Sequence, residues 1–295
     1  MASEQQTQKP VGINAVIYAT DFSKHSENAG QYARLLAHQL EAKLLVAHSF
    51  LLTQAAEEAE LILKAPSHQR EHYEALLIRR AGELAFDSIN PAPVLLEGLP
   101  HESIPALAEK NAPAMIVLGT RGSGPVQHEL LGSTAEKILR STRRPCLTVG
   151  PKTPWPSPQT LPFQRILCVT DFTPEAIRAI VYALQLAQSG SRAIDVLHVV
   201  ARPPDDPRGW AELRESYFLA LDRLLPDRAQ ELRGAETQVE IGSLHDRILS
   251  HIREHRADLL VLGVRKSPHL DLEMRTSGVF RIIADALCPV LTITS

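Results

Sequence analysis

Short apolar runs alternate with longer amphipathic segments along the whole chain. Residues 13–19 form an apolar run of strand-forming residues, and residues 24–42 then carry apolar side chains on one helical stripe. Asp21 and Ser23 precede this stripe and offer oxygens that can cap the helix. The same alternation predicts strands over residues 43–50, 94–97, 114–119 and 146–149. Helices are predicted over residues 53–88, with an interruption near Pro66, over residues 102–110 and from Ser133.

The second half of the chain alternates in the same way. Thr173 followed by Pro174 predicts a helix start, because proline at the first helical position loses no hydrogen bond. Residues 202–209 are rich in proline and predict a loop. Strands alternating with helices predict a parallel sheet covered on both faces, with ligands beyond the carboxyl ends of its strands. Strands are predicted over residues 165–170, 193–200, 238–241, 258–263 and 290–294.

Four sequence landmarks occur twice in the same order. Residues 17–23 read IYATDFS, and residues 167–173 read LCVTDFT. Residues 98–119 and 242–263 each begin with glycine, carry histidine three residues on and end in VLG. Each half then closes with an apolar strand beside a Pro–Cys or Cys–Pro pair. We therefore predict two copies of one α/β unit.

A proline-rich stretch separates the two copies. Proline removes backbone donors and favours an extended chain, so residues 151–163 predict a semi-rigid linker. The first domain is expected at residues 11–150 and the second at residues 164–295, after a disordered N-terminus of residues 1–10.

Composition narrows the classes of partner. The formal net charge of the 295 residues is −3, which gives no whole-protein basic field for nucleic acid or anionic lipid. Cys146, Cys168 and Cys288 are scattered, without a disulfide framework or zinc spacing. The polar start lacks the apolar core of a secretion signal, and no apolar stretch is long enough to span a bilayer. We expect a cytoplasmic protein that binds neither nucleic acid nor membrane.

The strongest chemical signal is a glycine-containing loop between a predicted strand and a predicted helix. It runs from Gly119 through Gly122 and closes with Gly132, Ser133 and Thr134. Glycines let the backbone approach a ligand, and the start of a helix presents free amides that favour phosphate. Ser133 and Glu136, three residues later, predict a capping box. The loop is not a Walker A loop, because no Gly-Lys-Ser/Thr follows.

These residues resemble the universal stress protein family in its tandem, two-domain form. Its ATP-binding members carry G-x2-G-x9-G-[S/T], which matches Gly119, Gly122, Gly132 and Ser133. The Thr-Asp pair after the first strand and a G-x-P-x-x-x-I segment from Gly98 match as well. The resemblance covers nearly the whole chain. It implies two Rossmann-like domains of the adenine nucleotide alpha hydrolase type, each a five-stranded parallel sheet of order 3-2-1-4-5 with helices on both faces.

The resemblance also implies roles for matching residues. Asp21 would accept a hydrogen bond from adenine, and the alternative is that it is only a helix cap. Arg121 could neutralise phosphate, an inference from its charge alone. The other implied contacts are Ala19, Thr20 and Ser49 around adenine, Leu118 and Gly119 at the ribose, and Gly122, Gly132, Ser133 and Thr134 at the phosphates.

The implied function is a stress-response protein that binds ATP in its first domain and acts as a nucleotide-dependent sensor or interaction module. Mg²⁺ would be held mainly through the phosphates. No residue is assigned to catalysis, so hydrolysis is at most weak. Two alternatives stay open: a slow ATP-hydrolysing enzyme, and a scaffold with a vestigial site. The copies should pair through their last strands as an internal pseudo-dimer, while a homodimer and an unknown protein partner are left open.

The second copy departs from the glycine motif. Lys266 and Thr276 replace the second and third glycines, and their side chains would fill space where backbone should meet phosphate. Asp171 keeps the adenine-side carboxylate. We expect this copy to bind no ligand. The less favoured alternative is that it binds a different ligand through Arg265 and Lys266.

Several other signals are given structural interpretations. Two H-x-x-E-H segments, residues 68–72 and 251–255, have the spacing of inverted zinc peptidases. No third ligand is placed to complete a site, so we interpret both as polar helix faces and expect no metal ligands. His101 and His245 are interpreted as structural, and the Arg140, Arg143 and Arg144 cluster as cations near a helix C-terminus.

Overall fold

The structure is a computed structural model. It describes residues 12–51, 65–122, 131–157, 163–187, 193–224, 236–265 and 278–294. The predicted disordered N-terminus, much of the glycine loop and the Lys266 to Thr276 segment lie outside these residues.

The first copy contains the expected strands and helices, with small shifts at their ends. The longest predicted helix, over residues 53–88, is described from Ala65 as a helix that ends at Leu84. The elements are β1 (Ala15–Ala19), α1 (Lys24–Gln39), β2 (Lys43–Phe50), α3 (Ala65–Leu84), β3 (Ala92–Glu97), α4 (Pro100–Lys110), β4 (Ala114–Gly119), α5 (Ser133–Ser141) and β5 (Cys146–Val149).

The second copy repeats this order. The predicted loop over residues 202–209 is wrong at its end, because α7 begins at Pro207, where proline fits the first helical position. The elements are β6 (Arg165–Val169), α6 (Pro174–Ala187), β7 (Ala193–Val200), α7 (Pro207–Leu224), β8 (Glu236–Ile241), α8 (Leu244–His255), β9 (Leu259–Val264), α9 (Gly278–Asp285) and β10 (Val290–Thr294).

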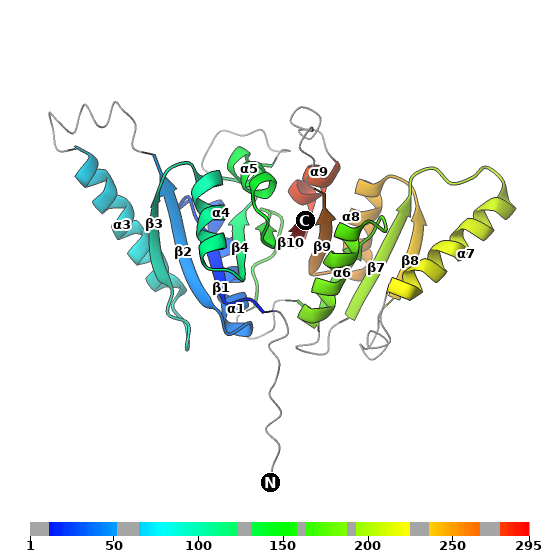
Figure 1. Ribbon diagram of the computed structural model, residues 1–295, viewed down its shortest axis with the longest axis horizontal. Helices are drawn as coiled ribbons and strands as arrows, with labels where there is room; N and C mark the ends of the chain where they lie inside the picture. The colour runs from blue at the N-terminus through cyan, green and yellow to red at the C-terminus, as the bar shows by residue number, and fades with distance from the viewer. Residues whose placement is uncertain are drawn as a thin grey trace, which may run out of the picture.

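All ten strands form one continuous sheet (Figure 1). Their order is β3-β2-β1-β4-β5-β10-β9-β6-β7-β8, so each copy runs 3-2-1-4-5 from its third strand at the outer edge to its fifth strand at the middle of the sheet. The strands are parallel within each copy. Only β5 and β10 pair antiparallel, with Leu147 opposite Leu291. The predicted pairing of the copies through their last strands is therefore confirmed: it joins the two sheets edge to edge and gives the chain the form of an internal pseudo-dimer.

Helices cover both faces of the sheet because alternate strand residues point to opposite sides. Val16 and Tyr18 pack with the buried faces of α1 and α3, whereas Ala15 and Ile17 pack with α4 and α5. In the second copy α6 and α7 share the first face, and α8 and α9 share the other. The copies meet at the paired strands β5 and β10, which we call the seam. Each core cluster continues across the seam, so the two copies share their cores.

The seam is also held by buried side-chain hydrogen bonds of near two-fold symmetry. The Thr148 hydroxyl donates to the Val290 carbonyl at 3.1 Å, and the Thr292 hydroxyl donates to the Cys146 carbonyl at the same distance. Cys146, Cys168 and Cys288 are free and buried, and burial raises the pKa of each thiol. They are therefore small core residues.

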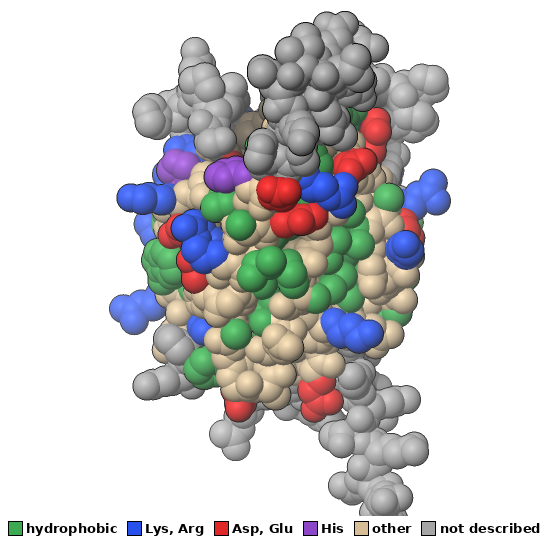
Figure 2. Space-filling view, turned by 90° about the vertical axis from the view of Figure 1, so that its left-hand side faces the viewer, with side chains coloured by type: hydrophobic (Ala, Val, Ile, Leu, Met, Phe, Trp, Pro, Cys, Tyr) green, Lys and Arg blue, Asp and Glu red, His purple; other side chains and the backbone are tan. Residues whose placement is uncertain are grey.

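The outer end of the first copy is an exposed edge of the sheet. Figure 2 looks onto this end, where hydrophobic side chains lie between charged ones. Ile78 of α3 is 63% exposed and Phe86 is 46% exposed. Within the described helices, none combines the length and the apolarity needed to cross a bilayer.

Candidate functional site

The turn after β1 is fixed by its own side chains. Phe22 adopts a left-handed backbone with φ 61°, which is unfavourable for a bulky residue. Its N–H donates to the Thr20 hydroxyl at 3.0 Å, and the Ser23 N–H and hydroxyl both donate to Asp21 Oδ1. These bonds compensate for the strained backbone and hold the Asp21 carboxylate at the strand end.

The predicted capping roles at this turn are wrong in detail. Ser23 is the N-cap of α1, but its side chain makes no cap hydrogen bond within the described residues. Its hydroxyl is turned toward Asp21 instead, at 2.6 Å. Asp21 lies two residues ahead of the N-cap and holds the turn rather than the helix.

A ring cluster supports the turn from the side of β2 and α3. The His48 ring lies 4.5 Å from Phe22 and 4.6 Å from Tyr73, measured between centroids. His48 Nδ1 lies 2.8 Å from the Thr20 carbonyl, so it must carry the proton that it donates. Burial lowers the pKa of His48, an effect that this hydrogen bond opposes without cancelling. The imidazole is therefore neutral near pH 7.

The second copy builds the same turn. Phe172 has φ 62°, its N–H donates to the Thr170 hydroxyl at 3.0 Å, and His198 Nδ1 lies 2.8 Å from the Thr170 carbonyl. Asp171 Oδ1 accepts from Thr173, as Asp21 does from Ser23. Because both copies carry it, the turn belongs to the fold, and the difference between the copies lies in the glycine loop.

The helix α5 begins with its amides facing β4. Gly132 is its N-cap, with the ordinary extended backbone of φ −61° and ψ 140°. The Gly132 N–H donates to the Thr120 carbonyl at 2.8 Å, which ties the helix start to the strand end. The predicted capping box is wrong: Ser133 is the first helical residue, and Glu136 pairs with Arg140 at 2.7 Å.

Two glycines leave space that a side chain would fill. A Cβ on Gly122 would lie 2.7 Å from Asp21 Oδ2, closer than real contacts allow. A Cβ on Gly132 would lie 3.1 Å from the Thr120 carbonyl oxygen and 3.6 Å from the Arg121 Cα. Both glycines thus let the loop, the helix start and the Asp21 turn approach one another closely.

A cavity of about 280 Å³ lies where these parts meet, at the carboxyl ends of β1, β2 and β4. Every site residue proposed from the sequence lines it: Ala19, Thr20, Asp21, Ser49, Leu118, Gly119, Arg121, Gly122, Gly132, Ser133 and Thr134. Sequence reasoning did not name as contacts the other lining residues, Ser26, Ala47, His48, Pro100, Ile104, Thr120, Ala135 and Ile138. For Pro100 and Ile104 the G-x-P-x-x-x-I segment was an available signal.

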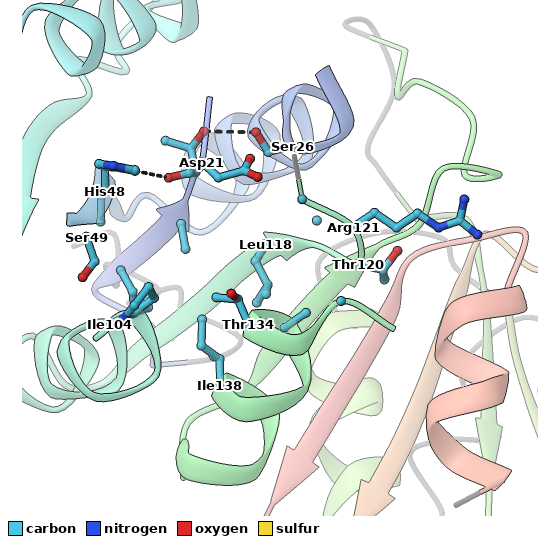
Figure 3. Close-up of a pocket in the computed structure, with 18 of the residues that line it drawn as sticks. Asp21, Ser26, His48, Ser49, Ile104, Leu118, Thr120, Arg121, Thr134 and Ile138 are labelled. Atoms are coloured by element: carbon cyan, nitrogen blue, oxygen red, sulfur yellow. Dashed lines mark hydrogen bonds between the residues drawn. The ribbon is translucent and has the colours of Figure 1, made fainter. Parts of the chain in front are cut away.

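The cavity has an apolar part and a polar rim (Figure 3). Leu118, Ile104 and Ile138 come from β4, α4 and α5 and lie on one side of it. The Ser49 hydroxyl at the rim donates to the Gly98 carbonyl and accepts from Ser103, so its orientation is fixed. The Arg121 side chain passes Thr120 and points away from Asp21, Ser49 and Leu118 in Figure 3, which gives no support to its predicted phosphate contact.

In the second copy the corresponding strand end is more crowded. A Cβ on Gly263 would lie 2.3 Å from the Glu175 backbone of α6, whereas the nearest atom to a Cβ on Gly119 lies 3.0 Å away. Arg265, a residue considered for an alternative ligand, has Nε 3.8 Å from the Glu175 carboxylate. Lys266 and Thr276 lie outside the described residues.

Two of the discounted signals have structural partners. His245 Nε2 lies 3.0 Å from Asp285, and Arg144 contacts Glu109, which fits their structural interpretation. The expectation that no third ligand accompanies an H-x-x-E-H segment is wrong for residues 251–255. Asp195 of β7 lies beside His251 and His255, a position that the spacing within one helix cannot reveal.

The fold and the cavity define a tandem, doubly wound α/β protein whose first copy has a pocket at its strand ends. The family model of the Universal stress protein family matches residues 12–150 and 162–294. The chain therefore belongs to the universal stress protein family, as a tandem member with two repeats.

Relatives and solved structures agree with this assignment. A Thermus aquaticus universal stress protein is 31% identical over 143 residues, which is 46% of this chain and 98% of the relative. A Methanocaldococcus jannaschii universal stress protein is 24% identical over 155 residues, 46% of this chain and 94% of the relative. A universal stress protein structure from Archaeoglobus fulgidus matches 95% of this chain and 96% of its own, with 20% identity and a TM-score of 0.68.

Proposed function

We propose that the first domain, residues 11–150, binds ATP in the cavity at the ends of β1, β2 and β4. The observation that carries the proposal is that the spaced glycines, the Asp21 turn and the start of α5 line one cavity. These features lie far apart in the sequence and serve one ligand only if they meet.

The cavity residues suit the parts of an adenine nucleotide. The apolar side chains of Leu118 and Ile104 offer contact to a ring, and the Asp21 carboxylate offers an acceptor for the adenine amine. The first turn of α5 has amides without intrahelical partners, which bind phosphate oxygens well. Ser133 and Thr134 add hydroxyl donors at the same helix end.

The described cavity residues offer few ligands for Mg²⁺. Asp21 is the one carboxylate among the described cavity residues, and its Oδ1 already accepts from Ser23. Mg²⁺ ordinarily uses phosphate oxygens and water together with few protein ligands. The residues therefore fit an ion that enters with the triphosphate.

We propose that nucleotide occupancy, rather than turnover, is the signal of this protein in a stress response. The second domain, residues 164–295, would then take no nucleotide, because Lys266 and Thr276 replace two loop glycines. Residues 151–163 would link the domains, and the shared seam would carry an occupancy-dependent change in the first domain to the second.

Calorimetric titration of the full chain with ATP, ADP and AMP tests this function. We expect one ATP site per chain and weaker binding as phosphates are removed. Binding of two equivalents would contradict the assignment to one domain. Steady hydrolysis abolished by Gly122→Ala would favour the enzyme alternative, and an empty protein with no titration would favour a scaffold.

A further inference from the structure

A second group of ligand-type side chains lies in the second copy, at the opposite end of the sheet from the cavity. Asp195 is the third residue of β7, and His251 and His255 lie one turn apart near the end of α8, which packs on β7. Asp195 Oδ2 is 3.5 Å from His251 Nε2 and 4.0 Å from His255 Nδ1. One ligand atom from each of the three residues lies within 4.8 Å of the others.

The group is buried and its polar atoms are unsatisfied. The side chains of Asp195 and His251 are 0% exposed, and that of His255 is 26% exposed. Within the described residues, both Asp195 oxygens and His251 Nε2 have no hydrogen-bond partner. The Arg165 guanidinium approaches Asp195 Oδ2 at 3.6 Å, an ion-pair contact without a hydrogen bond. Buried polar atoms are nearly always paired, and a bound ion would supply a partner for these three atoms.

The spacing suits a metal ion better than a shared proton. A charge-assisted N–H···O bond measures about 2.7–2.9 Å, well below the 3.5 Å between His251 Nε2 and Asp195 Oδ2. Two ligands bound at about 2.0–2.1 Å to a tetrahedral zinc ion lie roughly 3.4 Å apart. The distance from His251 to Asp195 is close to this separation, and the distance from His255 is a few tenths of an ångström longer. The His251 and His255 rings are stacked with their planes 2° apart, so the partly exposed His255 ring has to turn for both imidazoles to reach one ion.

His251 also has a carboxylate beside its second ring nitrogen, as metal-binding histidines commonly do. Glu240 Oε1 of β8 lies 3.4 Å from His251 Nδ1, on the side of the ring away from Asp195. Metal-binding histidines commonly give their second nitrogen to a carboxylate, which fixes the ring and makes it more basic.

The first copy shows that the fold does not require these polar residues. At matching positions in its strands and helix it carries Leu45, Leu96 and Leu107, which pack as part of the apolar core. The second copy has Asp195, Glu240 and His251 there instead, with His255 where the first copy has Asn111. Where the first copy has three leucines, the second has two carboxylates and an imidazole, and burying such groups is costly unless they are paired or bound.

We propose that Asp195, His251 and His255 bind a divalent transition-metal ion of the zinc class. Imidazole and carboxylate are zinc ligands, and three protein ligands leave a fourth position for water. Glu240 orients His251 from behind, and the bound ion fastens α8 onto β7. The site is distinct from the nucleotide cavity and does not depend on it.

Metal titration of the full, nucleotide-free chain tests the proposal. After chelator treatment, Co²⁺ should bind at one buried site per chain and give the visible absorption of a four-coordinate ion, which Zn²⁺ then displaces. Bound Zn²⁺ should raise the unfolding temperature, because the folded state alone presents the three ligands together. The variant Asp195→Leu/His251→Leu, which copies Leu45 and Leu107 of the first domain, should stay folded and lose both effects.

Two further variants sharpen the result. Glu240→Gln should weaken Co²⁺ binding about 10–100-fold while the spectrum is kept, as expected of an outer partner. His38→Asn removes an exposed His–carboxylate pair of the first copy and should change nothing. If the double variant fails to fold, His255→Gln at the partly exposed ligand replaces it and should abolish the four-coordinate spectrum. Equal Co²⁺ binding by the ligand variants, or no binding by the wild type, would overturn the proposal.

Discussion

Gly132→Val should abolish tight ATP binding and leave the protein folded. The Gly132 backbone is one that any residue adopts, so the change strains no dihedral angle. The nearest atoms to a new Cβ are all backbone of the Thr120 to Gly122 segment, at 3.1, 3.6 and 3.8 Å. A branched side chain would therefore wedge the loop away from the start of α5, where the phosphates are proposed to lie.

The size of the effect follows from the bonds that this wedge removes. Loss of two charge-assisted amide–phosphate hydrogen bonds, at about 1.5 kcal/mol each, amounts to about 3 kcal/mol. That loss corresponds to a dissociation constant more than about 100-fold weaker. Valine is also a poor N-cap compared with glycine, which costs the fold about 1 kcal/mol.

Calorimetry with ATP measures the affinity, and thermal unfolding without nucleotide measures the fold. Thr276→Val, at the matching place in the second copy, should leave ATP binding unchanged. If Gly132→Val bound ATP as tightly as the wild type, the phosphates could not lie between Gly132 and the Thr120 segment. An unfolding temperature many degrees lower would instead make the loss of binding uninformative about the loop, and Gly132→Ala would then be the variant to measure.

Three further changes probe other parts of the molecule. Asp21→Asn keeps an oxygen that accepts from Ser23, so the turn should remain, but loss of the carboxylate should weaken ATP binding about tenfold. Asp171→Asn, the control in the second copy, should leave ATP binding unchanged. Equal ATP affinities of the two variants would show that Asp21 does not contact adenine. Because burial lowers the folded-state pKa of His48 below its ordinary 6.5, the unfolded chain takes up the proton first, so stability should be full above about pH 6.5 and fall as the pH drops below it. Urea unfolding at a series of pH values should show a smaller loss of unfolding free energy at low pH in His48→Gln than in the wild type. An unchanged pH profile would exclude His48 as the source of that loss. Thr148→Val and Thr292→Val each remove one buried seam hydrogen bond and should cost about 1 kcal/mol apiece, with nearly equal losses; strongly unequal losses in denaturant unfolding would mean that the two sides of the seam are not equivalent.

Much of the fold could be predicted from the sequence because its signals are local or repeated. The bounds of β2, β4 and β5 match the predicted apolar runs, since buried parallel strands are short and continuously apolar. The repeat predicted two similar units. The pairing of β5 with β10 was predicted as well, but from the resemblance to the family and not from the repeat, because a repeat does not show which edge strands meet.

The candidate site was predictable where a residue type is forced by geometry, and hidden where geometry brings distant residues together. Spaced glycines revealed the loop because only glycine tolerates its close contacts. The role of Ser23 was mistaken because its hydroxyl has two partners within reach, the helix amides and Asp21, and sequence cannot choose between them. His48 gave no signal, because a histidine that ends beside a strand-end carbonyl looks like any other strand residue.

The two copies show how one fold can carry different chemistry at its two ends. Both keep the strained turn, with Phe22 and Phe172 at nearly the same φ, although only the first keeps the loop glycines. A strained turn that is present in both copies must be held by the packing and hydrogen bonds around it. The loop can then differ between the copies without loss of the fold. The same holds for the positions of Leu45, Leu96 and Leu107 in the first copy, where the second copy has two carboxylates and a histidine. Two copies that share a seam can thus differ in the residues at their strand ends, since both keep the same core and the same turn.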